Sequence, residues 1–88
     1  MTAPKKYKFE DDSYYVIEPN ETHERYRWVW TEQDNQGAWF SEAGSWTDSY
    51  SKALRSAADD WDGAGSGGRL SATLRGAASR IEKNRYAS

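Results

Sequence analysis

The feature that most constrains this fold is a shortage of large aliphatic side chains beside an excess of aromatic ones. Five tryptophans and six tyrosines occur in 88 residues, whereas leucine, isoleucine, valine and phenylalanine together number only nine. Each large aromatic side chain buries roughly 150–250 Å², so the sequence predicts a core of aromatic rings within one small domain. We expect the remaining rings to be exposed, or to be covered by a second copy of the chain in a homodimer.

Several protein classes are excluded by what the chain lacks. It contains no cysteine, which rules out disulfides, thiolate zinc sites and cysteine nucleophiles. No apolar run approaches the roughly 20 residues that span a bilayer. The segment from Met1 to Glu10 carries lysines without the hydrophobic stretch of a secretory signal. We therefore expect a soluble cytoplasmic protein with no membrane partner.

The first half of the chain predicts an antiparallel meander of three strands. Residues 13–18 are rich in β-branched and aromatic side chains, residues 24–32 alternate with a period of two, and residues 38–43 follow a turn sequence. Residues 1–12, in which three lysines precede three acids, are expected to form a flexible tail. Helical patterns occupy the second half of the chain, so the predicted fold class is α+β.

The second predicted strand has one wholly aromatic face. Its aromatic positions are Tyr26, Trp28 and Trp30. We expect this face to be core, covered by a helix. Arg25 and Arg27 lie on the opposite face and are not interleaved with these rings, which disfavours a stacking platform for single-stranded nucleic acid. The hairpin register is open, so the sequence does not tell whether Trp39 or Phe40 joins the aromatic face.

Two helices are predicted after the strands. The first closes a core segment of order βββα at residues 13–62, and its N-cap is either Ser45 or Thr47. Its apolar positions at helical spacing are Tyr50, Ala53, Leu54, Ala57, Ala58 and Trp61. A glycine-rich linker at residues 63–68 separates it from a basic C-terminal helix at residues 69–88. Whether this second helix docks on the core is open.

Charge is segregated along the chain, although its net value is only −2. Residues 10–62 hold thirteen acids against four bases, whereas residues 63–88 hold five bases against one acid. One interpretation is intramolecular, with the basic helix docked beside the acidic region. The other is that the acidic surface meets a partner with a basic surface, because such patches steer association. The carboxylates and exposed indoles expected to make that contact are Asp59, Asp60, Asp62, Glu42, Asp48, Trp39 and Trp46.

Direct binding of nucleic acid is the alternative function. It would use the basic side chains of the second predicted helix to contact phosphates. These side chains are Arg69, Arg75, Arg80, Lys83 and Arg85.

Catalysis, cofactors and metals have no specific support in the sequence. Residues 63–68 match the pattern G-x-G-x-x-G, but a helix precedes them where a dinucleotide site needs a strand. His23, the one histidine, lies in a polar turn without indicated catalytic partners. The three acids at residues 59–62 lack the later glutamate of a calcium loop. We expect a protein that is not an enzyme and holds neither cofactor nor metal.

Four stretches give the chain the character of a known group of small proteins: Tyr14–Glu18, Arg25–Glu32, Trp39–Ala43 and Thr47–Trp61. Together they outline a cysteine-free, aromatic-rich meander followed by a helix. This outline resembles, in general type, small accessory proteins of phages and mobile elements, among them the anti-CRISPR inhibitors of bacterial defence. The resemblance implies a binding protein in a bacterial cytoplasm that inhibits a host complex handling nucleic acid by occluding it.

Overall fold

The computed structural model describes residues 5–9, 12–65 and 68–86, which form one antiparallel sheet and two helices. The elements in chain order are β1 (Tyr7–Lys8), β2 (Tyr14–Pro19), β3 (Tyr26–Gln33), β4 (Trp39–Ala43), α1 (Tyr50–Gly63) and α2 (Arg69–Tyr86). The predicted α+β class is confirmed. The predicted number of strands was wrong, because the sheet has four strands in the order β1-β2-β3-β4.

The additional strand, β1, lies in the segment for which the sequence predicted a flexible tail. Tyr7 pairs with Tyr15 of β2, and its side chain is only 5% exposed. Its hydroxyl lies 3.4 Å from the hydroxyl of Tyr50 in α1. Burial of this one ring offsets the entropy lost when the segment is ordered. Residues 1–4 and 10–11 of the predicted tail lie outside the described residues.

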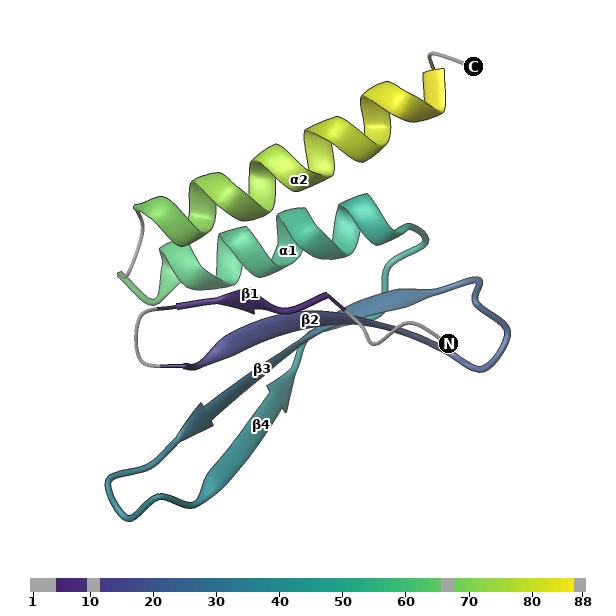
Figure 1. The fold of residues 1–88 in the computed structure, drawn as a ribbon. Coiled ribbons are helices and arrows are strands. Elements are labelled where there is room, and N and C mark those ends of the chain that lie inside the picture. Colours follow the sequence, from purple (N-terminus) through teal and green to yellow (C-terminus); the bar gives the residue numbers. More distant parts are fainter. Residues whose placement is uncertain (1–4, 10–11, 66–67, 87–88) are drawn as a thin grey trace.

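The two helices form a layer on one face of the sheet (Figure 1). Helix α1 packs against β2 and β3, while α2 packs against α1 and β1, so the second helix is docked. The N-cap of α1 is Ser49, whose Oγ accepts a hydrogen bond from the backbone N–H of Lys52 at 3.1 Å. The prediction of Ser45 or Thr47 was wrong, because Thr47 is held by two backbone hydrogen bonds to Tyr26 of β3.

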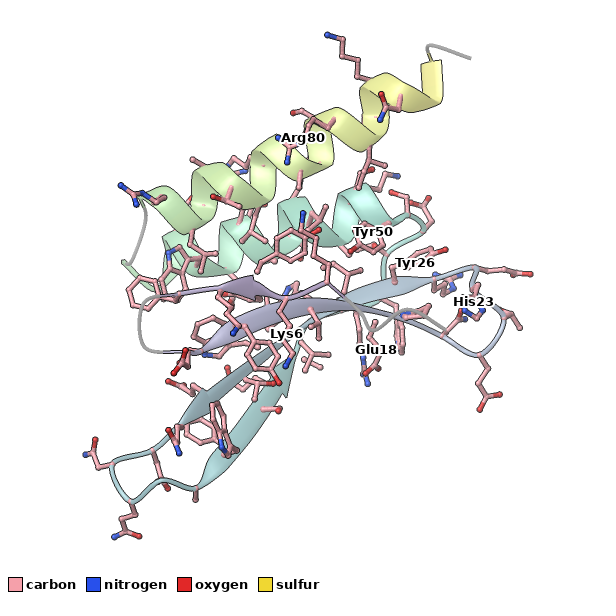
Figure 2. The ribbon with its side chains drawn as sticks, in the orientation of Figure 1. Lys6, Glu18, His23, Tyr26, Tyr50 and Arg80 are labelled. Atoms are coloured by element: carbon pink, nitrogen blue, oxygen red, sulfur yellow. The ribbon has the colours of Figure 1, made fainter. Side chains whose placement is uncertain are left out.

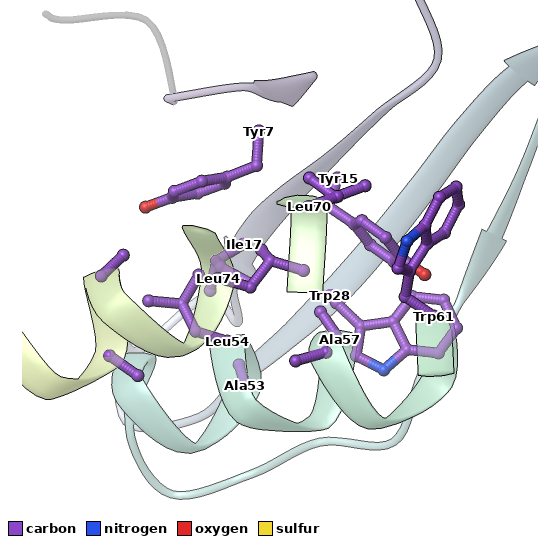
Figure 3. Packing of buried hydrophobic residues seen from close by; sticks show 13 residues of the cluster. Tyr7, Tyr15, Ile17, Trp28, Ala53, Leu54, Ala57, Trp61, Leu70 and Leu74 are labelled. Atoms are coloured by element: carbon purple, nitrogen blue, oxygen red, sulfur yellow. The ribbon is translucent and has the colours of Figure 1, made fainter. Parts of the chain in front are cut away.

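The core lies between the sheet and the helices, and it is built from rings and small side chains (Figure 3). Tyr15, 1% exposed, meets Trp28 edge-on with ring centroids 5.6 Å apart. Trp61 of α1 packs on Trp30 at 5.1 Å. Alanines on the facing sides of the helices are buried, which lets the helices approach closely. The buried alanines are Ala53, Ala57, Ala58, Ala77 and Ala78.

The hairpin of β3 and β4 extends beyond the helical layer (Figure 1). All five residues of β4 are exposed. The register pairs Gln33 with Trp39 and Glu32 with Phe40. Because side chains alternate between faces, Phe40 shares the helix side of the sheet with Trp30, and Trp39 lies on the opposite side. This settles the register that the sequence left open.

Candidate binding surface

One face of the sheet carries no helix, and we call it the open face. Strand register assigns residues to it, since Lys8 pairs with Tyr14, Tyr14 with Thr31, and Thr31 with Ser41. Its members are Lys6, Lys8, Tyr14, Val16, Glu18, Arg27, Val29, Thr31, Gln33, Trp39, Ser41 and Ala43. Figure 2 shows Lys6 and Glu18 on this side of the sheet and Tyr26 and Tyr50 on the helix side.

A shallow, solvent-open pocket of about 560 Å³ occupies one part of the open face. It is lined by Lys6, Lys8, Asp12, Tyr14, Thr31 and Trp39. The Lys6 ammonium lies 4.7 Å from the ring centroid of Tyr14, within the range of a cation–π contact. The indole of Trp39 is 53% exposed. Two aromatic rings, two ammonium groups and the carboxylate of Asp12 therefore border one hollow.

Arg27 and Trp46 form a second basic and aromatic pair on this side of the sheet. The Arg27 guanidinium lies 4.4 Å from the Trp46 ring centroid, and its Nη2 is 2.8 Å from Oε1 of Glu18. The backbone of Gly44 is hydrogen-bonded to that of Trp28, and the backbone of Thr47 to that of Tyr26. Ser45 and Trp46 therefore both lie opposite the single residue Arg27. This bulge turns Trp46 toward the arginine. The indole of Trp46 remains 41% exposed.

The helix side of the hairpin has the opposite charge. Glu32 pairs with Phe40, and Glu42 pairs with Trp30, so both acids lie on this side. Tyr15 donates to Oδ2 of Asp60 at 2.8 Å. Burial raises the pKa of Tyr15 first, followed by this hydrogen bond and the negative charges of Asp60 and Glu42. Asp60 and Glu42, two of the acids expected to contact a partner, thus both lie near the hydroxyl of Tyr15.

The other predicted contact acids are paired within the molecule. Nη2 of Arg75 in α2 lies 2.9 Å from Asp59 and 2.6 Å from Asp62. The guanidinium of Arg75 holds the pKa of Asp62 below its usual range. Asp48 lies 2.9 Å from Nζ of Lys52, which lowers its pKa in the same way. The intramolecular interpretation, in which the basic helix docks beside the acidic region, therefore holds for Asp59 and Asp62. Asp48 is paired with a lysine of its own segment instead.

The basic residues predicted for nucleic-acid binding are not all available on the surface of α2. Arg75 is engaged by the two aspartates of α1. Arg69, Arg80 and Lys83 are exposed. The side chain of Arg85 lies outside the described residues.

The surface brings together some predicted contact residues and others that sequence reasoning missed. Trp39 and Trp46 are exposed, as expected. Trp39 shares its pocket with Lys6, Lys8 and Asp12, and Trp46 lies against Arg27, so none of the predicted contact acids stands beside them in these contacts. Lys6 and Lys8 were assigned to a tail, and Tyr14 to the core-forming strand. The alternation of Lys6 and Lys8 about the buried Tyr7 is the signal that could have placed them on one strand face.

The remaining candidates of the sequence are its one histidine and its clusters of potential metal ligands. His23 is an exposed turn residue with a positive φ of 60°. No group of three potential metal ligands occurs among the described residues. Neither described helix has the length and apolar character needed to cross a membrane. Comparison of the chain with protein-family models, curated proteins and solved structures finds no match.

Proposed function

We propose that the protein is a non-catalytic binding module whose open face binds single-stranded nucleic acid. The observation that carries this proposal is the pocket in which Trp39 and Tyr14 stand beside Lys6 and Lys8. Exposed rings stack bases at about 1–3 kcal/mol per base, and ammonium groups contact the phosphates that connect them. The cations of Arg27 and Lys6 also lie on rings, which is how such surfaces combine charge with stacking.

The sequence disfavoured a stacking platform because the arginines lie on the face opposite the rings of the second predicted strand. That argument does not apply to the rings of the open face. Tyr26, Trp28 and Trp30 face the helices and belong to the core or pack against it. The arginine side of the sheet instead carries Tyr14 and Trp39, and Trp46 adjoins it through Arg27. Rings and cations therefore share one surface, as a single-strand platform requires.

The expected affinity is modest, because few cations face the ligand. Each phosphate contact on a single strand lowers the slope of log K against log salt by about 0.7. Contacts from Lys6, Lys8 and Arg27 would thus give a slope between about −1.4 and −2.1. Binding should be measurable at about 50 mM salt and should weaken by about five- to tenfold at about 150 mM.

Fluorescence polarisation with a labelled oligothymidine tests the proposal. We expect Trp39→Ala and the double variant Lys6→Glu/Lys8→Glu each to weaken binding at least tenfold. The matched control is Arg80→Glu/Lys83→Glu on α2, which reverses the same number of charges and should change binding little. No binding by the unmodified protein would refute the proposal. Loss of binding in the α2 variant alone would move the site to the basic helix.

A second candidate is the protein-binding inhibitor that the sequence predicts, of the anti-CRISPR type. The observation that favours it is the acidic and aromatic helix side of the hairpin, where Phe40 is 46% exposed beside Glu32 and Glu42. A partner with a basic surface would be occluded there, with Phe40 as a desolvated anchor.

Nuclease-treated pull-down from a bacterial lysate tests this second candidate. The candidate is supported if the unmodified chain captures a protein in stoichiometric amount and the double variant Glu32→Lys/Glu42→Lys does not capture it. Asp48→Lys is the control that should retain the partner, because Asp48 lies just before α1 and is already paired with Lys52. Capture that is insensitive to the hairpin charges would contradict this candidate.

A further inference from the structure

Strand β4 directs half of its backbone hydrogen-bonding groups away from the sheet. The N–H of Gly44 donates to the carbonyl of Trp28 at 3.0 Å, and the N–H of Asp34 donates to the carbonyl of Ala38 at 2.9 Å. Hydrogen-bonded and non-hydrogen-bonded pairs alternate along an antiparallel ladder. Residues 40 and 42 therefore bond to β3. The N–H and carbonyl groups of Trp39, Ser41 and Ala43 point outward.

This outward edge is unprotected among the elements that the structure describes. The sheet order places β4 at the end, and β3 is the one described element that it contacts. Natural edge strands are usually blunted by charged side chains, lysine above all, by proline, by bulges or by a covering segment. The sequence Trp-Phe-Ser-Glu-Ala of β4 contains neither lysine nor proline, its one charged residue is Glu42, and its five residues are exposed.

We propose that β4 pairs with β4 of a second copy of this chain, antiparallel and centred on Ser41. In this register Ser41 faces its own counterpart, and Trp39 faces Ala43 of the second copy. All three outward residues then form hydrogen-bonded pairs, which is the largest number that any register of this strand allows. The two sheets become one continuous sheet of eight strands.

The side chains of β4 favour a second copy over an unrelated strand. On the open face, each large indole of Trp39 meets a small Ala43. On the helix side, Phe40 meets Glu42 of the second copy, so no like charges stand directly opposite. The two Glu42 residues lie on a diagonal, with their Cα atoms roughly 7–8 Å apart, and Glu42→Gln should tighten the dimer. Pairing also covers part of the exposed ring of Phe40 on the helix side.

This pairing is independent of the ligand proposed above, but it would extend the open face. Both copies present that face on the same side of the joined sheet, because the two-fold axis is perpendicular to the sheet. Two pockets would then lie on one surface. Failure of the dimer would leave single-site binding intact, whereas failure of binding would leave the dimer intact.

Single cysteines in this cysteine-free chain test the register directly. Ser41→Cys places two thiols opposite each other, about 5.5 Å apart at Cα, and a short bismaleimide should couple the protein to a covalent dimer. Ser45→Cys is the matched control, because two such thiols would lie eight residues apart, about 27 Å. Equal coupling of the two variants would overturn the proposal.

Ser41→Pro with sedimentation velocity is the second test. It removes an N–H that points away from β3, so the fold should persist in circular dichroism while the dimer is lost. Coupling by Ser41→Cys decides the question if the proline variant does not fold. A monomer at all concentrations for the unmodified protein would overturn the proposal. A dimer that persists in the folded proline variant would also overturn it, because the copies would then meet elsewhere.

Discussion

The hydroxyl of Tyr15 donates to Oδ2 of Asp60 at 2.8 Å and so joins the start of β2 to the last turns of α1. The Tyr15 ring is fully enclosed and meets Trp61 edge-on at 6.2 Å. A buried phenol needs a partner for its hydroxyl. The core has few aliphatic side chains, and these two contacts of Tyr15 therefore determine the position of α1 along β2.

Tyr15→Phe should lower the free energy of unfolding by about 1–2 kcal/mol. The ring remains packed, but a hydrogen bond to a charged group is lost, and such bonds contribute about 1.5–3 kcal/mol. Asp60 is exposed, so water partly replaces the lost donor. Urea unfolding measures the change. Asp60→Asn keeps an acceptor and should cost less, and an unchanged midpoint for Tyr15→Phe would contradict this account.

Stability should fall as the pH rises above about 10. Burial raises the pKa of Tyr15 and of Tyr7 above the ordinary value of 10.0. The unfolded chain therefore loses these protons first, so their contribution is complete below pH 10 and is lost as the pH approaches the folded pKa values. Each tyrosine contributes a slope of up to about 1.4 kcal/mol per pH unit. Urea unfolding of Tyr15→Phe between pH 9 and 11 should show a shallower decline, and parallel curves would refute the assignment.

Gly44→Ala should destabilise the protein by about 1–3 kcal/mol. A Cβ at this position would overlap the indole of Trp28, including its Nε1. That indole cannot move freely, because it is buried and donates to Oγ of Ser56 at 3.2 Å. Overpacking of this kind typically costs about 1–3 kcal/mol. Thermal melting measures the loss, with Gly63→Ala as control, since a Cβ there meets no atom within 4 Å.

Leu74→Ala tests whether α2 is an integral part of the core. Leu74 is fully buried between the helices and the sheet. Removing a buried leucine side chain costs about 2–5 kcal/mol. Urea unfolding should show one cooperative transition at a lower midpoint. A wild-type midpoint would mean that α2 does not stabilise the remainder of the molecule.

The elements with a local repeat were predictable from the sequence. The stripe from Tyr50 to Trp61 recurs at helical spacing, and its members are buried or partly buried. The alternation around Trp28 likewise identified the core face of β3. Strand β1 was missed, because the alternation of Lys6 and Lys8 about Tyr7 is too short to distinguish a strand from a tail. Its position depends on the pairing of Tyr7 with Tyr15, which is a contact between separate strands.

The candidate site was predictable only in part, because it depends on contacts between elements. The exposure of Trp39 and Trp46 followed from the aromatic excess, and both are exposed. Their neighbours follow from the hairpin register and a bulge, neither of which composition determines. The acids of α1 looked available to a partner because the sequence does not show that Arg75 lies beside them.

A titration of the ¹⁵N-labelled protein with oligothymidine, followed by NMR, tests the central claim most directly. Binding on the open face predicts the largest shift changes at the Trp39 indole and at the amides of Lys6, Lys8 and Tyr14. Amides of α2 around Arg80 should change little. Changes concentrated on α2, or none at about 50 mM salt, would contradict the assignment of the open face as the binding surface.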